Sequence, residues 1–325
     1  MYLKRLLLVI GLVCGSAYLL GYFFDQRYRK RMQYHVFDKV DEALHTNSRS
    51  DFNVIYLGNS RVHGGINPYY VDSITGLHSF NFALGACDEQ EMKLITTLYL
   101  QNHTPPQIAV IGVDKAMLVK YNILKERFPY LFYVDRDSVS AYMRINGFPT
   151  GIIRVFPFIK YSFFDEYNRT AIFVPGPRME RSGHSIYNGF VNLFGDQYMD
   201  SISKPKNRDP LSPKELPRRQ KINDTSAAVF EQTVQLLQSK GTQVVFLFCP
   251  SRLKKEITDS VTNLQHFFLA LANRKNIPIL RADTSSLYTR EYFYDNFHLN
   301  EPGSRILSRQ VGAFINELRK NNQDK

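Results

Sequence analysis

The chain has 325 residues, of which 44% are hydrophobic and 22% are charged, a balance that excludes a wholly disordered protein. Its three cysteines are too few for a disulfide scaffold, and their spacing offers no zinc site. The net charge is +11, and its meaning depends on where the charge lies.

The positive charge is concentrated in two short segments, residues 1–31 and 201–221. The first holds six basic side chains and one acidic one, and the second holds seven and two, so each carries +5. The other residues carry 28 basic and 27 acidic side chains, a net charge of +1. The body of the protein is therefore nearly neutral, and we expect no nucleic-acid partner. Four prolines in 201–221 favour a solvated loop, with attraction to an anionic glycan or to lipid headgroups as the alternative.

The first predicted element is an uncharged run of 19 residues from Leu6 to Phe24. A helix of this length spans about 28 Å, close to the ~30 Å hydrocarbon core of a bilayer. Lys4 and Arg5 precede the run, a basic cluster over 27–31 follows it, and no convincing cleavage site comes after it. We therefore predict an uncleaved single-pass anchor over 1–31, in contact with membrane lipid, in preference to a buried core helix.

Two signals for the orientation of this anchor conflict. The larger number of basic residues after the run favours a cytoplasmic body. A very short basic tail before a first helix is, in contrast, typical of an anchor that exports the rest of the chain. We expect the body on the extracytoplasmic side.

After a predicted linker over 32–50, short apolar runs alternate with amphipathic segments. The apolar runs predict strands at 53–57, 79–83, 108–112, 244–248 and 277–280. Helical spacing predicts helices over 88–101, from a cap at Asp224 or Thr225 to Gly241, over 259–275, and over 301–319 with Asn300 as its cap. This alternation is typical of an α/β fold, a three-layer sandwich around a mostly parallel five-stranded sheet. This alternation of strands and helices is missing between about 116 and 222. We therefore predict one domain over 51–325 that carries a long insertion there.

Reactive side chains in such a fold collect at the carboxyl ends of the strands. Ser60 follows the first strand, and Asp295 and His298 lie beyond the last one. A serine nucleophile needs a base that takes its proton and a carboxylate that orients the base, and these three residues supply that set. Taken singly, Gly-x-Ser is also a common helix cap, and Asp-x-x-His is a common capped turn. His63, beside two glycines, is expected on a surface loop rather than as a second base.

Three segments resemble the sequence blocks of the SGNH/GDSL hydrolase family. Ile55–Arg61 resembles the first block, Asn81–Gly85 the second, and Asp295–Leu299 the last one. The resemblance implies a flavodoxin-like fold with Ser60 as nucleophile, His298 as base and Asp295 as the carboxylate. It also implies that the Ser60 and Gly85 N–H groups, or Ala86 in place of Gly85, form an oxyanion hole. Asn59 and Arg61, which flank the serine, are then the expected substrate-binding residues.

One position departs from the family pattern. The third block of the family carries an Asn that donates to the oxyanion, but Asp114 stands at that place here. Either Asp114 is protonated and donates, or another donor such as Arg61 substitutes, or turnover is slow. Losing one such donor typically slows catalysis by about 10²–10³-fold.

The anchor, the Gly-Asn-Ser-Arg first block and the long insertion together resemble the envelope members of the family that handle acyl esters on glycans. The alginate O-acetylation proteins and the teichoic-acid D-alanylation protein are of this kind. The resemblance implies a serine esterase or O-acyltransferase that acts on acyl esters, expected to be acetyl, of a cell-envelope glycan, without a metal or cofactor. The alternatives are a non-catalytic envelope protein that binds a polysaccharide or a membrane-bound acyltransferase, and, on net charge alone, a nucleic-acid protein.

Overall fold

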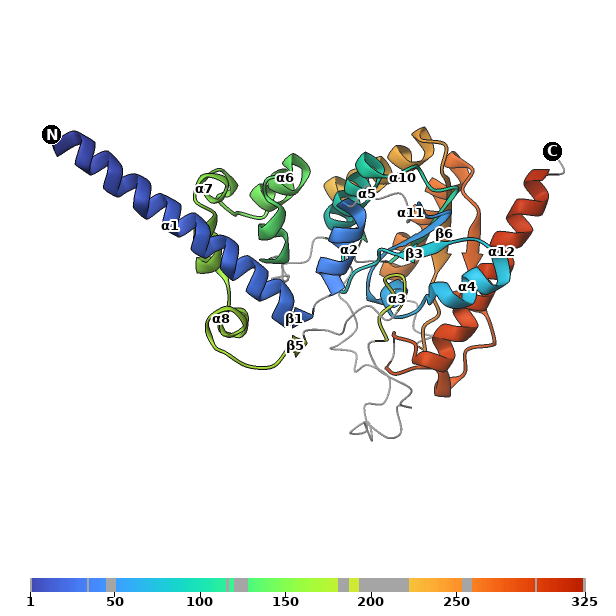
Figure 1. Cartoon of the computed structure of the whole chain (residues 1–325). Helices are drawn as coiled ribbons and strands as arrows, with labels where there is room; N and C mark the ends of the chain where they lie inside the picture. Colours follow the sequence, from blue (N-terminus) through green and yellow to red (C-terminus); the bar gives the residue numbers. More distant parts are fainter. Residues whose placement is uncertain are drawn as a thin grey trace. The chain divides into compact units, whose positions relative to one another are not determined.

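In the computed structural model, the described residues are 2–33, 35–44, 51–114, 117–119, 128–180, 187–192, 222–252, 259–295 and 297–323. The chain divides into two compact units (Figure 1). The first unit combines 1–37 with 124–184, and the second combines 38–123 with 185–325.

The second unit is built around a five-stranded sheet. Its strands are β2 (Val54–Leu57), β3 (Ser79–Asn81), β4 (Ile108–Gly112), β6 (Gln243–Phe248) and β7 (Ile279–Arg281). They lie in the order β3-β2-β4-β6-β7, and every neighbouring pair is parallel. This is the 2-1-3-4-5 order of flavodoxin-like doubly wound folds. The predicted fold class is confirmed, and the sheet is parallel throughout.

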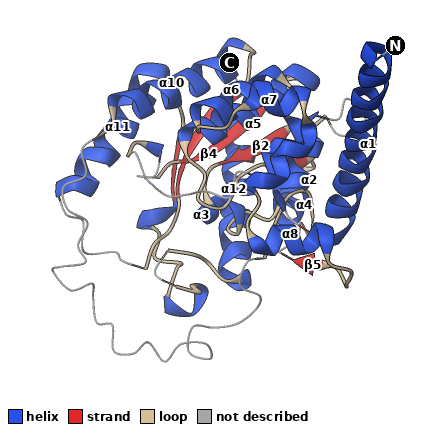
Figure 2. Ribbon diagram, turned by 90° about the vertical axis from the view of Figure 1, so that its left-hand side faces the viewer, coloured by secondary structure: helices blue, strands red, loops and turns tan. Residues whose placement is uncertain are grey.

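The central strands are apolar at nearly every position because both faces of the sheet are covered. β2 and β4 are buried at every residue, as parallel strands between two helical layers must be. Figure 2 shows the strands lying between helices. Successive side chains therefore enter opposite layers, so that Val54 and Tyr56 belong to one core cluster while Ile55 between them points to the other face.

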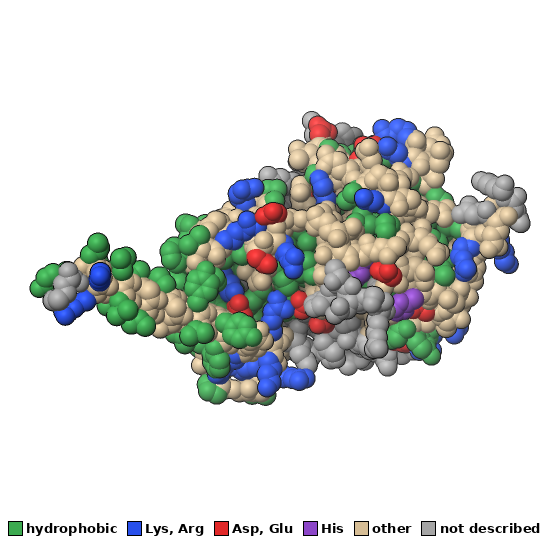
Figure 3. Space-filling model, turned by 45° about the horizontal axis from the view of Figure 1, so that its top comes forward, with side chains coloured by type: hydrophobic (Ala, Val, Ile, Leu, Met, Phe, Trp, Pro, Cys, Tyr) green, Lys and Arg blue, Asp and Glu red, His purple; other side chains and the backbone are tan. Residues whose placement is uncertain are grey.

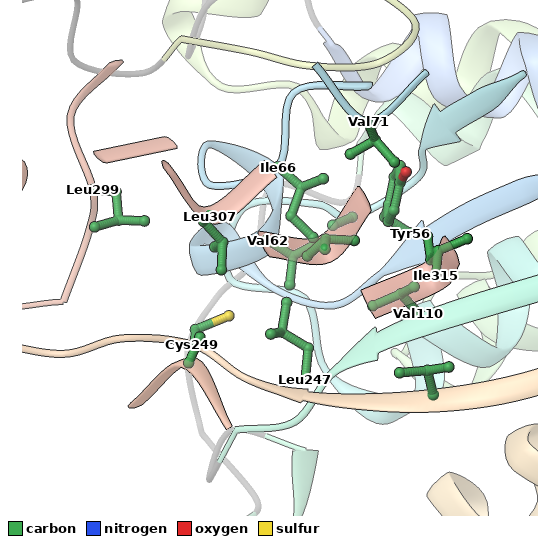
Figure 4. Packing of buried hydrophobic residues seen from close by; sticks show 14 of the residues in the cluster. Tyr56, Val62, Ile66, Val71, Val110, Leu247, Cys249, Leu299, Leu307 and Ile315 are labelled. Atoms are coloured by element: carbon green, nitrogen blue, oxygen red, sulfur yellow. The ribbon is translucent and has the colours of Figure 1, made fainter. Parts of the chain in front are cut away.

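Two sets of helices cover the sheet. One set consists of α3 (Ser60–His63), α4 (Pro68–Thr75) and α12 (Glu301–Gln323), which share a buried cluster with β2, β4 and β6 (Figure 4). The other consists of α5 (Glu89–Asn102), α10 (Asp224–Ser239) and α11 (Asp259–Lys275). On that side Phe230 of α10 and Phe268 of α11 pack edge-on against each other and lie close to Phe246 of β6.

The four predicted helices of this unit are present with small changes at their ends. α10 is capped by Asn223, one or two residues before the predicted caps, and its side chain accepts the N–H of Ser226 at 3.0 Å. Asn300 caps α12 as predicted, accepting the N–H of Gly303 at 3.0 Å. α4, which Asn67 caps and Gly76 ends, has only eight residues, too few to show a helical period in the sequence.

The first unit contains the amino-terminal helix α1 (Tyr2–Arg31), which is long and apolar enough to cross a membrane. It also contains part of the predicted insertion. The insertion elements are η2 (Phe128–Tyr133), α6 (Asp137–Ile145), α7 (Thr150–Val155), η3 (Pro157–Phe163), α8 (Glu166–Phe173) and β5 (Met179–Glu180). β5 pairs in parallel with β1 (Met32–Gln33).

The described residues of the predicted linker over 32–50 include regular structure. It contains β1 and the helix α2 (His35–Leu44). The basic segment 201–221 lies outside the described residues, so its interpretation as a solvated loop stays a prediction.

Candidate active site

Ser60 lies at the carboxyl end of β2, where the chain turns sharply into α3. Asn59 caps this short helix, and its side chain accepts the N–H of Arg61 at 3.1 Å. Gly58 makes the turn with φ +146°, where a Cβ would come within 2.8 Å of Val62 Cγ2. β2 and β4 are the two strands between which the winding direction of the sheet reverses, the usual place of a site in this fold.

His298 and Asp295 lie on a tight turn before α12. The N–H of Tyr294 donates to the His298 carbonyl at 2.9 Å, which closes the turn. Asp295 Oδ1 accepts the backbone N–H groups of Phe297 at 2.7 Å and His298 at 2.8 Å. The other carboxylate oxygen is thereby fixed toward the His298 ring.

The structure brings these three side chains into one hydrogen-bonded series. Ser60 Oγ lies 2.8 Å from His298 Nε2, and His298 Nδ1 lies 2.8 Å from Asp295 Oδ2. An ionised carboxylate only accepts, so Nδ1 carries the hydrogen and Nε2 is left to accept the Ser60 hydroxyl. This is the tautomer in which the imidazole can take a proton from the serine.

The electrostatics of Asp295 favour its charged form. Burial raises its pKa, but the hydrogen bond from the His298 ring, the Phe297 and His298 N–H groups and the attraction of the ring outweigh burial. The pKa of Asp295 is therefore lowered below its ordinary value, and the carboxylate is ionised at neutral pH.

The second predicted block lies against the first through the side chain of Asn81, which is fully buried. Its amide donates to the carbonyls of Val62 at 2.9 Å and Ile66 at 2.8 Å, while its oxygen accepts the N–H of Ala83 at 3.0 Å. The Leu84 N–H donates to the Gly58 carbonyl at 3.1 Å. The chain after β3 is therefore held beside the turn that carries Ser60.

The N–H groups of Ser60, Gly85 and Ala86 form no hydrogen bond to any part of the chain that the structure describes. Gly85 and Ala86 are exposed, and Ala86 adopts the left-handed backbone with φ +51°. A non-glycine residue in this region is uncommon and costs free energy, a feature that occurs often at functional sites. Both residues remain candidates for the second oxyanion donor.

Asp114, expected at the oxyanion hole, and Arg61, expected at the substrate, pair with each other. Arg61 Nη1 donates to Asp114 Oδ2 at 2.9 Å, so the carboxylate accepts where the family's Asn donates. Arg61 Nη2 donates to the carbonyls of Cys249 at 2.5 Å and Pro250 at 2.9 Å. Burial lowers the pKa of Arg61, but the nearby negative charges, chiefly that of Asp114, raise it by more. The pKa of Arg61 is therefore above its ordinary value. The guanidinium thus joins the ends of β2, β4 and β6, and its expected contact with a substrate stays a prediction.

Sequence reasoning missed a buried contact behind the second block. His63, expected on a surface loop, is fully buried, and its Nδ1 lies 2.8 Å from Lys39 Nζ of α2. The same ammonium donates to the carbonyl of Ala83. Burial lowers the pKa of Lys39 well below its ordinary value. Lys39 lies one turn from both Val36 and Ala43 on the apolar face of α2, which is the signal that pointed to its burial.

The described residues contain neither a candidate metal-binding group nor a disulfide bond. No group of three or more His, Cys, Asp or Glu side chains is placed there to hold a metal ion. Cys14, Cys87 and Cys249 are free thiols, and burial raises the pKa of Cys249 to about 11.

Fold and site together define a doubly wound α/β protein with a serine, a histidine and an aspartate joined at the switch point of its sheet. No family model matches the chain, and no curated protein does. Among solved structures it is similar to a GDSL-like lipase from Bacteroides thetaiotaomicron, with 11% identity and a TM-score of 0.41 over 91% of this chain and 99% of the other. It is also similar to an acetyl xylan esterase, with 10% identity and a TM-score of 0.42 over 81% and 98%. At this level of similarity, the chemistry has to be inferred from the side chains of this chain.

Proposed function

We propose that this protein is a membrane-anchored serine esterase or O-acyltransferase, with Ser60 as nucleophile, His298 as general base and acid, and Asp295 as the orienting carboxylate. The observation that carries the proposal is the pair of 2.8 Å contacts that joins Ser60 to His298 and His298 to Asp295. Nucleophile, base and carboxylate at hydrogen-bond distance in this order are the arrangement that activates a serine.

In the proposed reaction Ser60 Oγ attacks the carbonyl carbon of an ester while its proton passes to His298 Nε2. The carbonyl oxygen becomes an oxyanion, which the N–H groups of Ser60 and of Gly85 or Ala86 stabilise. When the carbonyl re-forms, the alcohol leaves with the proton from His298 and an acyl group stays on Ser60. Water or a sugar hydroxyl then gives its proton to His298 and attacks the acyl carbon. The bond from that carbon to Ser60 Oγ breaks, His298 returns the proton to Oγ, and the free acid or the new sugar ester leaves.

The oxyanion side of this site is weaker than the nucleophile side. The side-chain donor expected at Asp114 is replaced by a carboxylate that pairs with Arg61. A missing oxyanion donor slows turnover, which suits an enzyme whose acyl-enzyme waits for a particular acceptor. The same pairing favours the alternative of a non-catalytic protein that binds a polysaccharide or a membrane-bound acyltransferase.

We infer that the substrate is an acylated cell-envelope glycan, with acetyl as the expected acyl group and no nucleic-acid partner. The support is the resemblance of the three sequence blocks, together with the anchor and the insertion, to envelope proteins of the SGNH/GDSL family. We keep the division into an anchor over 1–31, a linker and an α/β domain over 51–325 as part of this proposal.

We also propose that α1 stays in the mature protein as a membrane anchor. Its last turns are built into the first unit: Tyr28 is fully buried, and its hydroxyl donates to Asn168 Oδ1 at 2.5 Å. Removal of α1 as a signal peptide would take these contacts away. We propose an extracytoplasmic α/β domain.

Labelling with a fluorophosphonate probe tests the enzymatic proposal, because the probe phosphonylates only an activated serine. The full-length protein in detergent is expected to form an adduct that Ser60→Ala and His298→Ala abolish. Ser73→Ala, which removes an exposed hydroxyl of α4, is the matched control and is expected to label normally. Absence of a Ser60-dependent adduct would favour the binding protein.

A second experiment separates the two enzymatic reactions. The purified protein is incubated with an acetylated glycan, with and without a non-acetylated glycan as acceptor. Release of free acetate alone indicates an esterase, and appearance of acetyl esters on the acceptor indicates a transferase.

A further inference from the structure

Several exposed apolar side chains of the insertion lie on or next to elements that contact α1. They come from α7, the residue that follows it, η3 and the end of α8, and each is 41–57% exposed. We use the name collar patch for this set of six residues: Ile152, Val155, Phe156, Phe158, Phe163 and Phe173. Figure 3 shows apolar side chains along α1 that continue onto the adjoining elements of its unit.

The elements that carry the collar patch are fixed to the second half of α1. The Tyr18 hydroxyl donates to the carbonyl of Val155 at 2.9 Å, and the Tyr161 hydroxyl donates to that of Gly21 at 2.7 Å. The rings of Phe24 and Phe173 pack edge-on, 5.1 Å between centroids. Figure 1 shows α7 and α8 alongside α1. These contacts fix the position of the collar patch along the axis of α1.

That height overlaps the apolar run of α1. Residues 2–17 precede the contact between Tyr18 and Val155, and 16 helical residues span about 24 Å, less than the ~30 Å of a hydrocarbon core. A bilayer that α1 crosses must therefore extend past Tyr18 toward Phe24. The patch adjoins the stretch from Tyr18 to Phe24, which is about 9 Å long. Interfacial helices bury their apolar faces to a similar depth of about 5–10 Å.

Just after the apolar run of α1, a carboxylate of the helix is paired with a lysine of the insertion. Asp25, the first acidic residue after the apolar run, contacts Lys160 Nζ at 2.5 Å and accepts the Tyr161 hydroxyl at 2.6 Å. Lys160 is only 4% exposed. A carboxylate close to hydrocarbon is tolerated when it is neutralised in this way. The insertion thus presents apolar side chains outward and keeps its ion pair inward.

We propose that the collar patch is a second membrane-contacting surface, which enters the hydrocarbon boundary of the bilayer beside α1. The proposed occupant is lipid, because the patch is continuous with the apolar surface of the anchor and lies at the depth where the bilayer must reach. The proposal goes beyond the esterase or transferase activity, and it rests on the proposed insertion of α1. Its consequence is that the first unit is fixed to the membrane surface by more than one helix.

The absence of tryptophan from the chain allows a direct test. Phe158→Trp and Phe163→Trp each place a single fluorophore in the patch, and Leu12→Trp places one in the apolar run as the membrane control. Each full-length variant is reconstituted in phosphatidylcholine–phosphatidylglycerol vesicles with and without dibrominated acyl chains, and iodide is added as the aqueous quencher. We expect the brominated lipid to remove at least half of the fluorescence at all three positions, with little quenching by iodide.

The control separates failure of the patch from failure of the anchor. Lipid quenching at Leu12→Trp, combined with iodide quenching at both patch positions, would overturn the collar proposal and leave the anchor intact. Patch positions shielded from both quenchers would indicate coverage by protein and would equally overturn it. Iodide quenching at Leu12→Trp would contradict the anchor itself. A change of fold caused by a variant is excluded by an unchanged fluorophosphonate adduct at Ser60 or, if none forms, by unchanged circular dichroism.

Discussion

The two sides of the candidate active site differ in how completely they are built. On the nucleophile side, Ser60, His298 and Asp295 are joined by two 2.8 Å contacts, and Asp295 is fixed by two backbone N–H groups. On the oxyanion side, backbone N–H groups are in place that bond to no described part of the chain. The carboxylate of Asp114, however, pairs with Arg61 where a side-chain donor is expected.

In the proposed mechanism, activation of the serine and stabilisation of the transition state therefore depend on different parts of the fold. The first depends on one turn before α12, and the second depends on contributions from the ends of several strands. We expect a serine that reacts readily with strong electrophiles and turns over ordinary esters slowly.

The largest effect is expected from Ser60→Ala, which removes the nucleophile without disturbing the turn. Esterase activity on an activated acetyl ester should fall by about 10³-fold or more. The melting temperature should stay unchanged, because Ser60 Oγ is half-buried and bonds only to His298 in the described structure. Residual activity near the wild-type level would place the nucleophile elsewhere.

Asp295→Asn tests whether the carboxylate sets the tautomer of His298. An amide can donate to Nδ1, so Nε2 would carry the hydrogen and lose its ability to accept from Ser60. We expect the rate to fall by about 10²–10⁴-fold. Asp135→Asn, at an exposed position of the first unit, is the charge-matched control and should leave the rate unchanged.

Asp114→Asn tests the oxyanion side directly by introducing the side-chain amide that the resemblance in sequence led us to expect at this position. If the missing donor limits turnover, kcat should rise by about 10- to 100-fold. Stability should fall by about 1–3 kcal/mol, since Arg61 loses its counter-charge in a mostly buried site. A lower kcat would show that the ion pair itself shapes the site.

Lys39→Met gives the smallest effect and concerns the contact that holds Ala83. The pKa of Lys39 is lower in the folded protein than its ordinary value of 10.5. Between these two pKa values the unfolded chain holds the proton and the folded protein does not. The stability of the wild type should therefore rise with pH on the alkaline side, by at most about 1.4 kcal/mol per pH unit. Urea unfolding at pH 8 and 9.5 should show this rise in the wild type and a smaller one in Lys39→Met. Equal slopes would contradict the assigned pKa shift.

The sequence predicted those parts that local pattern controls. The strands β2, β4 and β6 are apolar over several residues because both faces of the sheet are covered there, so their runs are visible without a structure. Ser60, Asp295 and His298 were found because parallel strands bring their carboxyl ends to one edge.

The rest depends on contacts between distant segments. The pairing of Asp114 with Arg61 joins residues 53 positions apart, and no local pattern indicates it. His63 was misplaced because two following glycines suggested a loop, whereas Lys39, 24 positions away, accompanies it in the interior. The packing of the insertion against α1 likewise could not be predicted from the aromatic-rich stretch alone.

The most direct test of the proposed mechanism is to find the acyl-enzyme. The full-length protein is mixed with an activated acetyl ester, quenched in acid within the first turnover, digested and mapped by mass spectrometry. We expect an acetyl group on the peptide that contains Ser60, with an initial burst of product equal to the enzyme concentration and slow turnover after it. An unmodified Ser60 in a protein that still releases product, or no reaction with either the ester or the fluorophosphonate, would contradict the mechanism.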